Sequence, residues 1–131
     1  MDSKFYVSLE AARLLKEKGY DRECIAYYQN DEFHPYSVEL FKLSINDKNA
    51  APSYMNQYSA PTKAEAIDWL ESKGMTIDIH WIRFNENRRW NYSIFNCSTC
   101  DTIDTKYICT TRLEAEEAAI IKACEFLENG N

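Results

Sequence analysis

The clearest pattern of reactive side chains in the sequence is Cys97-Ser98-Thr99-Cys100, a pair of thiols separated by two residues. This spacing can serve zinc binding or thiol redox chemistry, but a structural zinc site needs four nitrogen or sulfur ligands. Only isolated candidates remain to complete such a shell: His34, His80 and Cys109. Redox thiol pairs usually stand at a helix N-terminus, whereas this pair follows a strand-like segment and precedes two acids. We therefore interpret it as a hairpin turn with two incidental thiols.

Asp78 and His80 alternate along a strand-like segment and are expected side by side on one face, where a carboxylate can tune a histidine base. The sequence contains no G-x-G-x-x-G, P-loop, H-E-x-x-H or G-x-S-x-G motif to accompany them. We therefore predict a protein without enzymatic activity, with no catalytic residues, no cofactor and no metal. A small hydrolase or thiol enzyme ranks third among the functions considered.

Aromatic residues and arginines are interleaved on or near one predicted hairpin, whose first strand contains Trp81. Tryptophan, tyrosine and arginine dominate the hot spots of protein interfaces, and they can also stack the bases and hold the phosphates of single-stranded nucleic acid. A simpler alternative is an aromatic row that faces the core, with arginines at the turn. The predicted interaction surface combines this hairpin with an acidic C-terminal helix and comprises Arg83, Arg88, Arg89, Trp90, Tyr92, Glu114 and Glu117.

The net charge of −6 decides between the two kinds of partner, because phosphate binding requires clustered cations. Residues 113–128 hold five acids and one lysine, whereas residues 83–89 hold three arginines and one glutamate. The leading prediction is a module that binds an unknown protein partner, and a homodimer is compatible with it. The alternative is a role related to nucleic acid, either single-strand binding by the hairpin or mimicry of nucleic acid by the acidic helix.

Three segments have the periodicity and the end signals of helices. The first spans residues 8–18, with Ser8 as the expected N-cap. Thr62 and Glu65 have the spacing of a capping box, in which each side chain accepts from an otherwise unpaired amide at the helix start. The same spacing recurs at Thr111, which predicts a third helix from there to about residue 127.

Strands are predicted at residues 24–29, 36–45, 75–84, 90–94 and 103–109, with polar turns at 30–32 and 85–87. The apolar alternation changes parity at Ile82 and Phe84, which predicts a bulge or a twist near the strand end. Residues 46–61 read as one long surface loop. The expected fold is a single α+β domain over residues 1–131, with an antiparallel sheet of about five strands and three helices packed on one face, in the order α-ββ-α-βββ-α.

Composition fits a globular chain, since 45% of the 131 residues are hydrophobic and 14% are aromatic. No apolar run approaches the ~20 residues of a membrane span, so we expect no membrane association. Residues 1–7 lack an apolar signal core, and five cysteines are an odd number for a disulfide framework. These features predict an intracellular, cytoplasmic protein.

Residues 58–73 (YSAPTKAEAIDWLESK) and the strand-like segment after them resemble a family of small proteins of phages and mobile elements of gut bacteria. The shared pattern is an S-A-P-T segment, a short helix with W-L, and an I-x-I strand. The segments 7–20 and 113–127 are similar to the two ends of that family. The resemblance implies a phage-type accessory protein that acts on a host factor in the host cytoplasm. The family has no established activity, so no catalytic residues follow from it.

Overall fold

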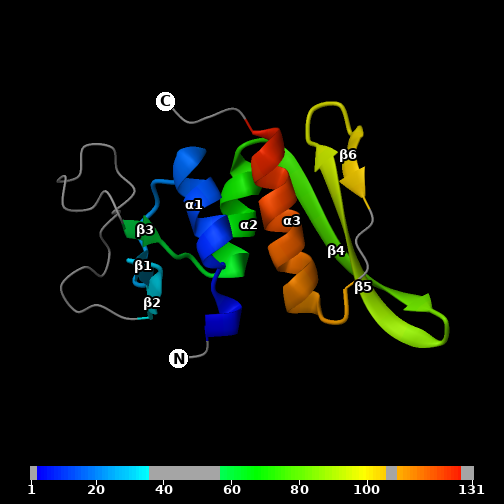
Figure 1. Ribbon diagram of the computed structural model, residues 1–131. Coiled ribbons are helices and arrows are strands. Elements are labelled where there is room, and N and C mark those ends of the chain that lie inside the picture. The colour runs from blue at the N-terminus through cyan, green and yellow to red at the C-terminus, as the bar shows by residue number, and fades with distance from the viewer. Residues whose placement is uncertain (1–2, 36–56, 106–108, 128–131) are drawn as a thin grey trace. The chain divides into compact units, whose positions relative to one another are not determined.

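The computed structural model describes residues 3–35, 57–105 and 109–127, and its contacts divide the chain into two compact units. The first unit comprises Met1–Thr62 with Leu127–Asn131, and the second comprises Lys63–Phe126. The α+β class is confirmed, with three α-helices and two three-stranded antiparallel sheets among the described residues (Figure 1). The prediction of one sheet of about five strands is therefore wrong. None of the helices in the described ranges is long and apolar enough to cross a membrane.

The first unit contains a 3-10 turn, η1 (Ser3–Phe5), one helix, α1 (Leu9–Glu17), and three short strands. The strands are β1 (Tyr27–Gln29), β2 (Glu32–His34) and β3 (Gln57–Ser59), arranged in the order β2-β1-β3. Helix α1 begins where predicted, because the Ser8 hydroxyl accepts a hydrogen bond from the Ala11 amide at 3.1 Å. Its core includes Val7, Leu15 and Tyr20, all fully buried or nearly so.

Strands β1 and β2 form a hairpin through Asn30 and Asp31, which have φ angles of 51° and 67°. Two consecutive left-handed residues define a type I′ turn, whose twist matches that of the flanking strands. Strand β3 lies inside the segment predicted as a loop and pairs with β1, placing Tyr58 opposite Tyr28. The loop prediction is therefore wrong at residues 57–59. The predicted strand at 36–45 and loop residues 46–56 lie outside the described residues.

The second unit follows the order α2 (Lys63–Ser72), β4 (Met75–Phe84), β5 (Asn87–Asn96), β6 (Thr102–Thr105) and α3 (Arg112–Phe126). Its sheet has the order β4-β5-β6, so β5 is central. A second type I′ turn joins β4 to β5 through Asn85 and Glu86, with φ angles of 49° and 67°. The predicted strand at 103–109 is found at Thr102–Thr105, and Cys109 forms an isolated bridge to Trp90, while residues 106–108 lie outside the described residues.

The ten residues of β4 pair with β5 without interruption, from Met75 opposite Asn96 to Phe84 opposite Asn87. The bulge predicted near Ile82 and Phe84 is therefore wrong, and the register shift lies instead between β5 and β6, at Ile94 and Phe95. The shift of the apolar residues from odd to even positions at Ile82 and Phe84 has another cause. Ile82 and Phe84 alternate onto the face opposite the buried one, at the far end of the strand where both faces carry exposed residues.

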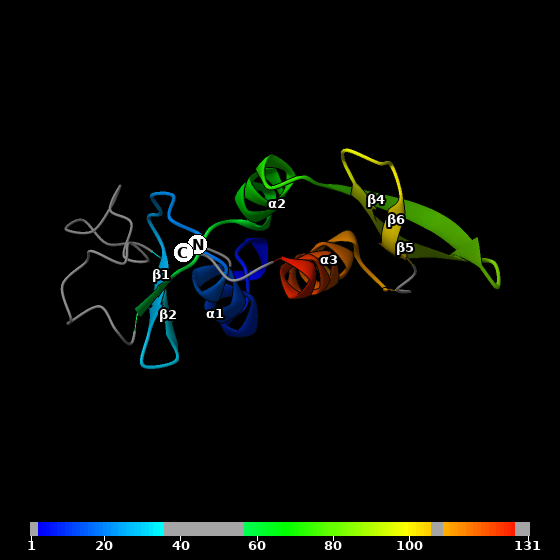
Figure 2. The same cartoon turned by 90° about the horizontal axis from the view of Figure 1, so that it is seen from above.

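Helices α2 and α3 cover one face of the second sheet (Figures 1 and 2). That face buries Met75 and Ile77 from β4 and Tyr92 and Ile94 from β5, while Thr76 and Asp78 on the other face are exposed. Helix α3 is capped by Thr111, whose hydroxyl accepts from the Glu114 amide at 3.1 Å. The Glu114 carboxylate accepts from the Thr110 amide at 3.4 Å, one residue before the position that a regular capping box uses.

Candidate interaction surface

The β4–β5 ribbon changes along its length, from a half buried under the helices to an exposed tip that extends beyond the start of α3 (Figure 1). Its cross-strand pairs on the helix-covered side run from Ile77 opposite Ile94 to Ile79 opposite Tyr92, then Trp81 opposite Trp90. On this side, the last pair before the turn is Arg83 opposite Arg88. We call the segment Trp81–Trp90 the hairpin tip.

Trp81 is the most exposed large hydrophobic residue among the described ones, with 55% of its surface accessible. The guanidinium of Arg88 lies over its ring, 5.1 Å from the ring centre, a distance at which a cation is attracted by the aromatic face. Across the ribbon, the Arg112 guanidinium lies 5.5 Å from the ring centre of the half-buried Trp90. The tip thus carries two arginine–tryptophan stacks on neighbouring cross-strand positions.

The opposite face of the tip is also partly apolar and partly basic. Phe84 is 45% exposed, and Ile82 and Arg89 form a half-buried cross-strand pair beside it. Both faces of the tip therefore carry an exposed aromatic ring and an arginine, and the arginine of the second face, Arg89, is half-buried.

Tyr92 does not belong to the exposed surface, although it was predicted there. Only 2% of it is accessible, and its hydroxyl donates a 2.6 Å hydrogen bond to the Asp104 carboxylate on β6. Burial, followed by the hydrogen bond with Asp104, raises the pKa of Tyr92 well above its ordinary value. The alternation that groups Tyr92 with Trp90 is correct, but α3 covers the face at the position of Tyr92.

Several acidic residues of α3 already take part in hydrogen bonds or ion pairs with neighbouring residues. The Glu114 carboxylate accepts a hydrogen bond from the Thr110 amide at the start of the helix, and Glu116 pairs with Arg112 at 3.5 Å. Lys122 pairs with Glu125 at 3.2 Å, and Glu117 is half-buried. These contacts reduce the negative field that mimicry of nucleic acid requires. Glu114 and Glu117 lie on α3, whereas Arg83, Arg88 and Arg89 lie in the hairpin tip, so the predicted surface draws on two separate elements.

Four reactive side chains of the second unit are accessible to solvent: Asp78, His80, Cys97 and Cys100. Asp78 and His80 interact as predicted, with Oδ2 and Nδ1 3.0 Å apart. Cys97 and Cys100 are free, exposed thiols, and the Cys97 sulfur lies 3.0 Å from the Thr76 hydroxyl. The described part of the chain holds no group of three or more His, Cys, Asp or Glu side chains placed to bind a metal.

The predicted turn at Cys97 is confirmed in the β5–β6 connection. Its shape is held by the Asn96 side chain, which accepts from the Ser98 and Thr99 amides at 2.8 and 3.2 Å. Cys100 takes a left-handed φ of 63° and its amide bonds back to the Asn96 carbonyl at 2.8 Å. Backbone and asparagine contacts therefore suffice to explain this turn.

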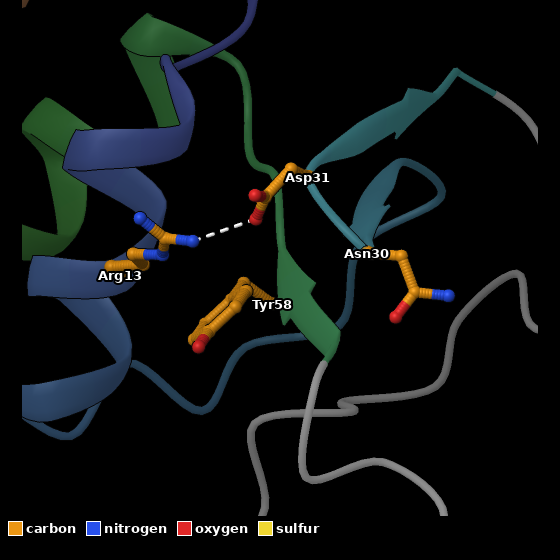
Figure 3. A pocket seen from close by; sticks show the side chains of 4 residues that line it. All are labelled: Arg13, Asn30, Asp31 and Tyr58. Carbon is orange, nitrogen blue, oxygen red and sulfur yellow. Dashed lines mark hydrogen bonds and ion pairs between the residues drawn. The ribbon is translucent and has the colours of Figure 1, made fainter.

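A shallow pocket of about 370 Å³ in the first unit was not predicted, and it is lined by Arg13, Asn30, Asp31 and Tyr58 (Figure 3). Arg13 and Lys16 both lie over the Tyr58 ring, at 5.6 and 5.1 Å from its centre. Their spacing of three residues on α1 was the available signal, but the sequence does not indicate that β3 brings Tyr58 beneath them. Both cations already have partners: Arg13 pairs with Asp31 at 2.6 Å, and Lys16 donates to the Gln57 carbonyl at 3.0 Å. This pocket is a weaker binding candidate than the tip.

Comparison of the chain with models of known protein families, with curated proteins and with solved structures finds no significant match to any of them.

Proposed function

We propose that this chain is a protein-interaction module that acts without catalysis, and that the hairpin tip is its binding surface. The observation that supports this most is the exposed Trp81 ring under the Arg88 guanidinium, with the exposed Phe84 on the opposite face of the tip. Tryptophan and arginine are enriched in interface hot spots. A phage-type accessory protein acting on a host factor, as the resemblance implies, is one concrete form of the proposal.

The pairing of charges in the tip supports a binding role over a structural one. Arg83 lies directly opposite Arg88, and like charges at directly opposed positions destabilise an antiparallel pair. The tip's only acidic residue is Glu86, in the turn. A local arrangement that works against stability is expected mainly where function requires it, and an acidic partner surface would offset this repulsion.

Site-specific photo-crosslinking tests the proposal, because the chain offers matched control positions. A benzophenone amino acid replaces Phe84 in one variant, and replaces Phe5 or Phe126 in two controls with 51% and 50% exposure. In the native cell, the Phe84 probe is expected to capture one protein species that neither control captures. The capture should disappear when Arg88→Ala and Arg89→Ala are added. Equal capture from all three positions would refute the proposal.

Single-strand nucleic-acid binding is the second candidate, and the two arginine–tryptophan stacks favour it. If Arg83, Arg88 and Arg89 each neutralise one phosphate, the affinity for a single strand should fall roughly twentyfold between 50 and 200 mM salt. Fluorescence anisotropy with a labelled 20-nucleotide thymidine strand measures this. Binding with that salt dependence, lost on Arg88→Ala with Arg89→Ala, would favour nucleic acid over protein.

A further inference from the structure

The outer edge of β4 exposes unpaired backbone groups at the hairpin tip, and the hydrogen bonds of the neighbouring strand show which ones. Trp90 exchanges two backbone hydrogen bonds with Cys109, each 2.8 Å long, so its N–H and C=O point away from β4. In an antiparallel register the residue directly opposite such a position points its own groups outward on the other side. Trp81 lies opposite Trp90. Its N–H and C=O, and those of Ile79 and Arg83 two residues to either side, therefore face the outer edge.

This edge lacks three of the features that often protect a sheet from strand addition: a short strand, a proline and a bulge. β4 is the outermost strand of the β4-β5-β6 order, and in the described part of the chain no further strand pairs with it. It is ten residues long, contains no proline, and keeps an unbroken register with β5. Natural edge strands are more often short, bulged or interrupted by proline. The exposed Trp81 ring adds an apolar surface beside the edge.

We infer that the segment Ile79–Arg83 accepts an extended acidic segment of the partner protein as an added strand. The inference rests on the proposed function and specifies its mode of binding. In strand addition the main chain supplies affinity and alternate side chains supply specificity. On the face that carries Trp81 and Arg83, an added strand should place an apolar side chain beside Trp81 and a carboxylate beside Arg83.

The charge pattern disfavours a second copy of this chain as the added strand. The residues of β4 with outward backbone groups are Met75, Ile77, Ile79, Trp81 and Arg83, which all lie on one face. In an antiparallel pair of two β4 edges, these residues oppose one another, and none of them is acidic. Asp78 lies on the other face and cannot come opposite Arg83 in any such register. An acidic strand from a different protein can place a carboxylate opposite Arg83, which a second copy of β4 cannot do.

The test uses the full chain and an eight-residue peptide with blocked ends, Thr-Val-Thr-Glu-Thr-Val-Thr-Glu, which places valine and glutamate alternately on one face. One control peptide carries lysine in place of glutamate. A second control keeps the acidic sequence but has N-methyl groups on alternate residues, which remove the donors needed for strand pairing. Amide signals and amide hydrogen exchange of Trp81 and Arg83 are followed by NMR. At about 90% occupancy, an amide that exchanges only from the free protein should slow roughly tenfold.

The expected result is that only the unmodified acidic peptide shifts and protects the Trp81 and Arg83 amides. Arg83→Glu should abolish its binding, whereas Arg89→Glu should weaken it less, because β4 separates Arg89 from the added strand. Equal binding of the N-methylated peptide, or no binding at millimolar concentration, would overturn strand addition. The proposed function would survive either result if the Phe84 crosslink persists. A concentration-dependent dimer in sedimentation velocity, with Trp81 protected in the absence of peptide, would overturn the acidic-partner assignment in favour of a second copy.

Discussion

Tyr92→Phe measures how much the buried half of the β4–β5 ribbon depends on one hydrogen bond, because it removes a hydroxyl and leaves the ring in place. The lost interaction is the 2.6 Å hydrogen bond to the Asp104 carboxylate. Hydrogen bonds to charged groups contribute about 1.5–3 kcal/mol. Asp104 is half-buried and can regain water, so the lower end applies. We expect Tyr92→Phe to lower the free energy of unfolding by about 1.5 kcal/mol at pH 8.

The same substitution should also change the pH dependence of stability. The raised pKa of Tyr92 means that the unfolded chain loses this proton first, near the ordinary tyrosine pKa of about 10. The stabilisation is therefore complete below that pH and is lost as the pH rises above it. Between pH 9 and 11 linkage allows at most about 1.4 kcal/mol for one tyrosine. We expect the wild type to lose about 1 kcal/mol more than Tyr92→Phe over this interval, after a discount for partial solvation of the pair.

Tryptophan fluorescence in urea measures the loss of stability at pH 8 and its pH dependence, and it reports on the unit that contains Tyr92. All three tryptophans, Trp69, Trp81 and Trp90, belong to the second unit, so their emission reports its unfolding. The other ionisable groups are common to both proteins, so the difference between the two curves isolates Tyr92. A change below about 0.5 kcal/mol at pH 8, or parallel losses of stability between pH 9 and 11, would contradict a stabilising hydrogen bond between Tyr92 and Asp104.

Three further predictions concern the helix cap, the second turn and the thiols. Thr111→Ala should lower the unfolding free energy of the second unit by about 1 kcal/mol in urea, and an unchanged midpoint would contradict the cap at Glu114. Glu86→Gly should raise the unfolding free energy of the second unit by about 0.5–1 kcal/mol, because glycine adopts the φ of 67° without strain. A lower unfolding free energy would contradict the type I′ turn. With an aromatic disulfide reagent, two thiols of the folded chain should react at least ~10-fold faster than the other three, and a single rate for all five would contradict the burial of Cys24, Cys109 and Cys124.

The sequence predicted the elements whose signals are local. Ser8 and Thr111 cap their helices as expected, since capping depends on residues three positions apart. Strand β3 was missed because its three residues have no period, and their pairing with β1 joins Tyr28 to Tyr58, thirty positions along the chain. Pairing at that separation depends on the whole fold and leaves no local pattern. The division into two sheets was missed for the same reason.

The candidate surface was predicted only in part, because alternation shows which face a residue occupies and does not show how far a helix covers that face. Tyr92 and Trp81 share a face, yet one is buried under α3 and the other is 55% exposed. The boundary lies at the Trp81–Trp90 pair, where Arg112 at the start of α3 lies over Trp90. Residues on the α3 side of this boundary should therefore govern stability, and residues on the turn side should govern binding. Arg88→Ala should then leave the unfolding free energy nearly unchanged, within about 0.5 kcal/mol, while it abolishes partner capture at Phe84.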